Sequence, residues 1–234
     1  MTTGCQKDEF HADQPENAVT EKSRIWLHRC NSIDKAIYAR QHYSGMEFDI
    51  FYIDSLETFS VKHDTETPDT LLIFEFLSSI PLPGKYSFWL DYKNLDQDNM
   101  IKSATVLKMI ADSLKIPADR FIVENYPQNL QPFSHAGFIT SYYIPWFDAA
   151  TLTEAQLNEK AANISSLIAS KPVNRLSCPY EQLWFLQKYF KTHPRMTWNN
   201  NQLSREEKIK FARKTLSDKQ VNVLLMSESP TQNQ

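Results

Sequence analysis

The sequence contains little glycine, few cysteines and no long apolar run. Only four of its 234 residues are glycine, and none stands in a G-x-G-x-x-G or P-loop pattern, which disfavours Rossmann-type and Walker-type nucleotide binding. No apolar run approaches the roughly 18 to 20 residues needed to cross a bilayer. The net charge is −3 and no dense lysine or arginine run occurs, so nucleic acid is not expected as a partner.

The three cysteines, Cys5, Cys30 and Cys178, form no C-x-x-C pair, which argues against a disulfide framework or a zinc site. Cys5 follows Thr-Thr-Gly and precedes a polar stretch typical of a flexible tether. This junction resembles that of a bacterial lipoprotein, which implies lipid attachment at Cys5 and a location in the cell envelope, although the basic and apolar leader is absent. The alternative is an ordinary disordered N-terminus of a cytoplasmic protein.

Short apolar runs alternate with amphipathic segments after the tether, the pattern of a parallel sheet covered by helices. The expected strands are 24–29, 46–52, 86–92, 120–126, 137–143, 174–178, 195–198 and 221–226. Eight strands with helical crossovers predict a compact (β/α)8 barrel of the TIM type, with an open doubly wound sheet as the alternative. We expect one monomeric barrel domain over 23–228, between a tether at 1–22 and a frayed tail at 229–234.

Helices are expected between most of these strands. The expected ranges are 32–43, 68–79, 100–114, 154–168, 180–191 and 204–216. The starts at Thr151-Leu-Thr-Glu154 and Ser204-Arg-Glu-Glu207 have the sequence of capping boxes. The link at 127–136 is short, and we expect only a turn there.

Two acids interrupt the second expected strand, which reads GMEFDIFY. Because side chains in a strand alternate between faces, Glu47 and Asp49 point one way while Met46 and Phe48 point the other. Two unpaired carboxylates in a desolvated site cost several kcal/mol each. That face therefore either opens to water or holds a positive group between the acids.

The third expected strand also ends with charged residues on one face, because Asp91 and Lys93 share a face with Trp89. Parallel strands of a barrel carry the active site at their carboxyl ends, so we expect Glu47, Asp49 and Asp91 to converge there. Carboxylate ligands suit one hard divalent cation, Mg²⁺ or Ca²⁺, better than zinc.

Two histidines flank the acids: His28 ends the first strand, and His63 follows the second, on what we expect to be a returning hairpin. Without a role as metal ligands, both are free for proton transfer. Taken singly, each residue also has a structural explanation, since E-x-D is common on solvated edges, Lys93 can pair with Asp91, and a histidine can be buried in a core. Their joint placement at consecutive strand ends favours an active site.

Together these motifs resemble the glycerophosphodiester phosphodiesterase group of the phosphatidylinositol-phospholipase-C-like superfamily. The sequence has His28-Arg29, Glu47-Phe48-Asp49, Val61-Lys62-His63-Asp64 and Asp91-Tyr92-Lys93 in the order of that family. Aspartate as the third acid is similar to the sphingomyelinase D and menorin-like branches, as are Asn31-Ser32 and Asp69-Thr-Leu71. The glycine that commonly follows His-Arg is Cys30 here, and Asn31-Ser32 replaces the usual P-E-N-T segment.

The resemblance implies a metal-dependent phosphodiesterase acting on glycerophosphodiesters or phospholipids. Glu47, Asp49 and Asp91 would hold the cation, Arg29 and Lys93 would bind phosphate oxygens, and His28 and His63 would act as acid and base. The aromatic content of 12% provides Tyr142, Tyr143, Trp146 and Trp198 as candidates to line a pocket for a lipid or choline-type headgroup.

Two other functions compete with this interpretation. A binding or scaffold protein can retain the barrel and its site residues without turnover, and hydrolysis of an aryl phosphodiester would distinguish it. A glycoside hydrolase barrel also uses paired acids, but it needs neither two histidines nor a lysine on the third strand.

Overall fold

The computed structural model describes residues 23–201 and 203–227. Its strands are β1 (Ile25–Leu27), β2 (Gly45–Ile53), β3 (Thr58–Val61), β4 (Ser87–Tyr92), β5 (Phe121–Asn125), β6 (Ile139–Tyr143), β7 (Arg175–Pro179), β8 (Arg195–Trp198) and β9 (Val221–Met226). The sheet order is β1-β9-β8-β7-β6-β5-β4-β2-β3, and an additional β1–β2 pairing closes it.

All strand pairs are parallel except β2–β3, an antiparallel hairpin at the carboxyl end of β2. The eight parallel strands therefore form an α/β barrel of the TIM type, as the sequence predicts, and the closing pair excludes the open sheet. The eight predicted strands match these parallel strands within two residues at every end. The returning hairpin before His63 is also present, as β3.

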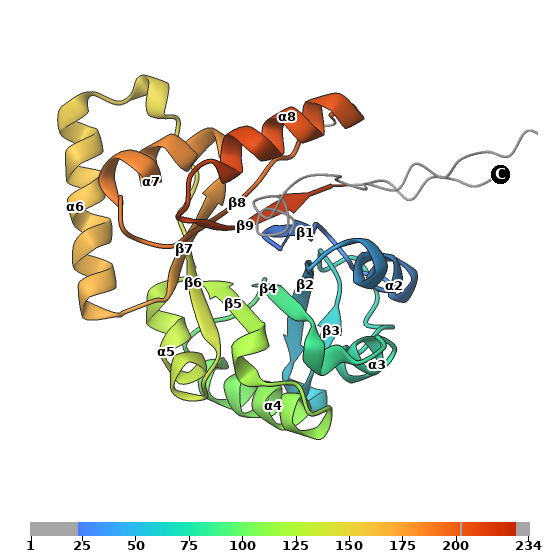
Figure 1. Cartoon of the computed structure of the whole chain (residues 1–234). Helices are drawn as coiled ribbons and strands as arrows, with labels where there is room; N and C mark the ends of the chain where they lie inside the picture. The colour runs from blue at the N-terminus through green and yellow to red at the C-terminus, as the bar shows by residue number, and fades with distance from the viewer. Residues whose placement is uncertain (1–22, 202, 228–234) are drawn as a thin grey trace, which may run out of the picture.

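Helices surround the barrel (Figure 1). They are α2 (Ile33–His42), α3 (Ile73–Ser78), α4 (Met100–Ser113), α5 (Pro127–His135), α6 (Glu154–Ser170), α7 (Leu183–Tyr189) and α8 (Arg205–Leu216). In the described part of the chain, no helix is long and apolar enough to span a membrane.

The expectation of a mere turn at 127–136 was wrong, because α5 occupies this link. Pro127 starts the helix, where a missing N–H costs nothing, but Pro132 lies inside it and removes one backbone donor. Leu130 and Phe133 on the same helix are fully buried. Burying two such side chains contributes about 1.5–3 kcal/mol each, which offsets the loss at Pro132.

One of the two predicted capping boxes was displaced. Helix α8 begins with the reciprocal Ser204–Glu207 bonds that the sequence indicates. Helix α6 is capped by Thr153 with Gln156 in place of Thr151 with Glu154. Either threonine has a hydrogen-bonding residue three positions later, so the local pattern alone did not separate the two starts.

The apolar residues form an outer layer under the helices and a smaller plug inside the barrel. In the outer layer, Phe48 of β2 contacts Phe76 of α3 with ring centroids 4.6 Å apart. The plug consists of Trp26, Trp89, Ile122, Met196, Val223 and Leu225. Gly45 belongs to this packing, since a Cβ added there would lie 2.2 Å from the Trp26 ring.

Candidate active site at the carboxyl ends of the strands

A cleft of about 380 Å³ opens above the plug, where the parallel strands end. Strands β1, β2 and β4 and the loop after β3 contribute His28, Arg29, Glu47, Asp49, His63, Asp91 and Lys93. Strands β5, β6 and β8 and the residues after them contribute Glu124, Asn125, Tyr126, Tyr143, Trp198 and Asn200. Trp89, Tyr92 and Leu225 complete the lining.

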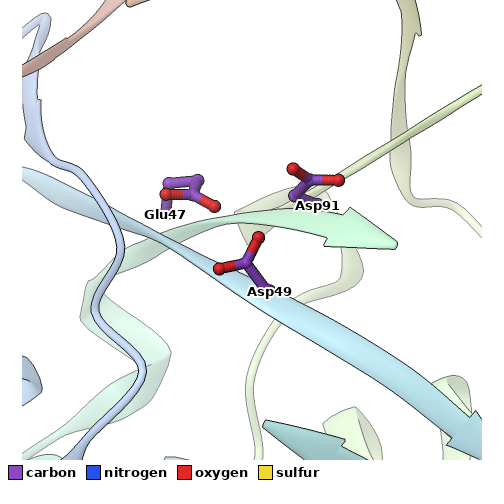
Figure 2. A group of neighbouring side chains, drawn as sticks. All are labelled: Glu47, Asp49 and Asp91. Atoms are coloured by element: carbon purple, nitrogen blue, oxygen red, sulfur yellow. The ribbon is translucent and has the colours of Figure 1, made fainter. Parts of the chain in front are cut away.

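Three carboxylates converge in this cleft (Figure 2). Glu47 and Asp49 lie on the inner face of β2, and the register of the two strands sets Asp91 of β4 directly beside Asp49. One oxygen from each of the three lies within 4.8 Å of the others. Glu47 and Asp49 are buried, whereas the Asp91 side chain keeps 35% of its exposure. The strand parity read from the sequence thus correctly predicts this acidic triad.

Lys93 connects two members of the triad. Its Nζ lies 2.7 Å from Asp49 Oδ1 and 2.5 Å from Asp91 Oδ2. Partial burial alone would lower the pKa of Lys93, but the Asp91 and Asp49 carboxylates outweigh it and raise the pKa above its ordinary value. Lys93 is therefore charged at neutral pH and compensates one of the three acids.

Glu47 is the most buried acid of the triad. Its Oε2 accepts a hydrogen bond of 2.6 Å from the backbone N–H of Arg29. Burial first, and then the charges of Asp49 and Asp91, raise its pKa well above the ordinary range. With Lys93 as the one counter-ion in contact among the described residues, the triad keeps a surplus of two negative charges when ionised. Oxygen donors with this surplus fit a hard divalent cation.

The loop after β1 orients Asp49. Asn31 donates from Nδ2 to Asp49 Oδ2 at 2.5 Å, and its Oδ1 accepts from the Asp49 backbone N–H at 2.9 Å. Both amide atoms of Asn31 are thus used on one residue. Asn31 is thus a positioning partner for a candidate metal ligand.

His28 lies at the end of β1 beside the triad, and it is buried. Its Nδ1 is 3.1 Å from Ser227 Oγ, and its Nε2 is 3.6 Å from Glu47 Oε2. Burial, and secondarily the charge of Arg29, lowers the pKa of His28 to about 3. Lys35 donates to the His28 and Arg29 carbonyls at 2.8 and 2.7 Å and so holds this turn, in which Arg29 has φ 57°.

His63 reaches the same cleft from the loop after β3. Its side chain is half exposed, and Nδ1 lies 3.9 Å from Asp64 Oδ2. Asp64 in turn accepts hydrogen bonds from the backbone and hydroxyl of Thr67. The two histidines therefore differ in environment, with His28 enclosed beside the triad and His63 open to solvent at the rim.

The aromatic residues predicted for a headgroup pocket separate into two groups. Trp198 and Tyr143 line the cleft, and their rings stack with centroids 5.8 Å apart. Tyr142, the neighbour of Tyr143 in the strand, points outward into the layer under the helices. Trp146 is 57% exposed and is not among the described residues that line the cleft. The structure thus does not bring Tyr142 and Trp146 to the site.

Glu124 of β5 was not recognised from the sequence. It is buried in the cleft, next to Asp91 in register, and Ser177 Oγ donates a hydrogen bond to its Oε1. Burial, and then the charge of Asp91, raises its pKa to about 8. The signal was present, since Glu124 follows Ile122 at the strand spacing that places Asp91 after Trp89.

Cys5 and the tether at 1–22 lie outside the described residues, as does the tail at 229–234. Lipid attachment at Cys5 and location in the cell envelope therefore stay predictions.

No family model matches this chain, and no curated protein matches it in sequence. Solved structures do match its fold. A glycerophosphodiester phosphodiesterase from Parabacteroides distasonis ATCC 8503 superposes with a TM-score of 0.62 at 12% identity, over 88% of this chain and 93% of that one. The glycerophosphodiester phosphodiesterase from Thermotoga maritima gives a TM-score of 0.57 at 11% identity, over 87% and 93% of the two chains. The chain thus has the barrel fold of glycerophosphodiester phosphodiesterases.

Proposed function

We propose that this protein is a metal-dependent phosphodiesterase that acts on glycerophosphodiester- or phospholipid-type substrates. The observation that carries the proposal is the convergence of an acidic triad, a lysine and two histidines in one cleft at the carboxyl ends of the barrel strands. The solved structures that share the fold are described as glycerophosphodiester phosphodiesterases, which supports this chemistry over other reactions of TIM barrels.

Glu47, Asp49 and Asp91 would hold one Mg²⁺ or Ca²⁺ ion, with Asn31 fixing Asp49. When bound, such an ion neutralises negative charge that develops on the phosphate during displacement. Lys93 already lies against two of the acids and would contribute a second positive charge on the same side of the phosphate. The exposed Arg29 side chain at the rim would bind a remaining phosphate oxygen.

His28 and His63 would transfer the protons. Both line the cleft, one from the end of β1 and the other from the loop after β3, so they approach a substrate above the triad from different elements. One would remove the proton from the attacking hydroxyl, and the other would protonate the leaving oxygen. The attacking hydroxyl would come from water or from a neighbouring group of the substrate.

The direct test is hydrolysis of glycerophosphodiesters and of bis(p-nitrophenyl) phosphate with Mg²⁺, Ca²⁺ or EDTA. We expect turnover with a divalent cation, loss of turnover in EDTA, and at least about a 10²-fold lower kcat for Asp49→Asn. The exposed Asp119→Asn variant is the matched control and should behave like the wild type. An absence of turnover with every cation, although the protein binds one, would contradict the proposal and favour the scaffold alternative.

We extend the proposal to the N-terminus: Cys5 would carry a lipid that holds the barrel at a membrane of the cell envelope. The polar stretch after Cys5 is the supporting feature. Mass spectrometry of the protein expressed with a bacterial lipoprotein leader would test this, because a Cys5→Ser variant should lack the lipid mass.

A further inference from the structure

His63 lies on a closed surface loop between β3 and α3. The backbone N–H of Val61 donates to the Leu71 carbonyl at 2.8 Å, so the two ends of the loop lie side by side. All eight residues from His63 to Thr70 are exposed. Apolar packing therefore does not fix this part of the chain, and segments without buried contacts are the ones that open most easily. A proton-transfer group on such a loop needs another contact to keep it at the cleft.

Lys62 supplies such a contact. Its side chain is only 8% exposed, and Nζ lies 2.8 Å from Asp69 Oδ1 and donates to the Thr67 carbonyl at 3.1 Å. The hydrogen bond from Lys62 lowers the pKa of Asp69 below its ordinary value, so this carboxyl is ionised at neutral pH. One buried ammonium group thus holds two exposed residues at the far end of the loop.

Lys62 is itself fixed to strand β2. Its backbone N–H donates to the Asp49 carbonyl at 3.2 Å. Its Nζ lies 5.2 Å from the centroid of the Phe51 ring, within the range of a cation–π contact. Asp49 and Phe51 both belong to β2, the strand that carries two of the candidate metal ligands. Lys62 therefore connects the loop of His63 to the strand that carries the acids.

Stability alone does not explain a lysine at this position. Burial of an ammonium group carries a cost of desolvation. The partners of Lys62 do not depend on it, because Thr67 and Asp69 are exposed and water would hydrate them in its absence. Lys62 is also not among the described residues that line the cleft, so it does not serve as a substrate contact. What the lysine provides is a defined position for the loop.

We infer that Lys62 is a positioning residue for the proposed reaction: it holds the loop at 62–70 so that His63 stays at the cleft. The inference rests on the proposed function, in which His63 transfers a proton. Small displacements matter at such a site, because a shift of about 1 Å in a catalytic geometry can lower the rate about 10²-fold.

The kinetic test compares Lys62→Met in two backgrounds. On glycerophosphodiesters we expect Lys62→Met to lower kcat by roughly 10- to 100-fold, with KM changed by less than about threefold. In the His63→Asn background the same change should lower kcat by less than about threefold, because the group that Lys62 positions is gone. Lys62→Arg keeps the charge and the donors, and it should restore part of the activity. An equal loss in both backgrounds, or no loss in either, would overturn the inference.

Two further variants leave the buried lysine in place. Asp69→Asn removes its exposed partner, so it should lower kcat by a smaller factor than Lys62→Met, and it carries the test if Lys62→Met does not fold. The matched control is Asp112→Asn, which removes the acid of the exposed Lys108–Asp112 pair on α4 and should behave like the wild type. Equal kcat values for Asp69→Asn and Asp112→Asn would count against the inference.

Backbone order parameters from NMR decide the inference independently of activity. We expect values of about 0.85 for the amides of residues 63–67 in the wild type and in Asp112→Asn, and values below about 0.6 in Lys62→Met. If the protein hydrolyses no phosphodiester, the proposed function fails, and these order parameters alone decide whether Lys62 holds the loop. A loop that is already mobile in the wild type, or one that is equally rigid in Lys62→Met, rejects the inference.

Discussion

Divalent cations should stabilise this protein, and removing them should lower its melting temperature. A ligand that binds only the native state at 100 times its Kd adds about 2.7 kcal/mol to the free energy of unfolding. For a domain of this size, 1 kcal/mol corresponds to about 2–4 °C in Tm, so we expect a rise of about 5–11 °C between EDTA and saturating Mg²⁺ or Ca²⁺. Differential scanning fluorimetry measures this directly.

The repulsion within the triad is the physical reason to expect that a cation binds there. Two unit charges 4.8 Å apart at an effective dielectric constant of about 20 repel by about 3.5 kcal/mol, so each pair of acids in the triad repels by about this much when both are ionised. The partial exposure of Asp91 reduces its share. Lys93 offsets part of this repulsion, and a bound cation would offset the rest.

Lys93→Met should therefore distinguish the stabilisation that Lys93 provides from the stabilisation that a bound cation provides. In EDTA we expect it to lower stability by about 3 kcal/mol, near the lower end for a broken buried ion pair, because the lysine side chain keeps 24% of its exposure. The rise in Tm with added cation should be larger than in the wild type, since a repelling charge next to the ion is gone. Asp91→Asn should show a smaller rise, and the exposed Asp119→Asn should match the wild type. An unchanged wild-type Tm with every cation, or an equal rise in Asp91→Asn, would refute this reasoning.

Three further predictions concern the residues around the triad. His28→Asn and His63→Asn should each lower kcat by roughly 10²–10⁴ on alkyl phosphodiesters, with the double variant little worse than the poorer single one; near-full activity of both singles would exclude their proton-transfer roles. Asn31→Ala should weaken cation binding about 10- to 100-fold in calorimetry, because it releases Asp49; an unchanged Kd would contradict this. In the folded protein the pKa of Glu124 is raised to about 8, so its protonated carboxyl stabilises the fold fully below about pH 4.5. This contribution to the free energy of unfolding is lost as the pH rises through 8. In EDTA, urea denaturation should show that the free energy of unfolding of Glu124→Gln rises relative to that of the wild type between pH 5.5 and 8.5. A difference between the two proteins that does not change with pH would contradict this.

Strand parity carried most of what the sequence could predict about the site. Alternation fixed which residues of GMEFDIFY enter the barrel, and counting strands fixed that β2 and β4 are neighbours. Those two facts bring Asp49 and Asp91 together without any knowledge of the loops. The same rule applied to Tyr142 and Tyr143 shows that they face opposite sides, and the structure turns Tyr143 inward.

Other features depend on contacts that the sequence does not display. The helix at 127–135 forms although it contains Pro132, because Phe133 packs against the ring of Tyr92 on β4 and against that of Phe138, which follows the helix. Glu124 remains buried because Ser177, 53 residues away, reaches it across β6. Tertiary packing decides such cases, and a single sequence carries little trace of it.

The triad lies beside the β1–β2 pairing that closes the barrel, which we call the seam. Residues of the candidate site therefore also contribute to the stability of the fold. Strands β1 and β2 share only the pair Leu27–Met46, so the ladder between them is very short. The loop after β1 continues the ladder with other donors: Cys30 N–H donates to the Glu47 carbonyl at 2.8 Å, and Arg29 N–H donates to the Glu47 carboxylate. The same loop holds the Asp49 backbone through Asn31.

Two of the three candidate metal ligands therefore take part in closing the sheet. The backbone of Glu47 and Asp49 holds the loop that carries His28 and Arg29. A bound cation would fix the side chains of the same two acids. Ion binding and closure of the seam should accordingly stabilise each other. Hydrogen exchange of the Cys30 and Asp49 amides is the measure of this coupling, since both should exchange more slowly when the cation is present.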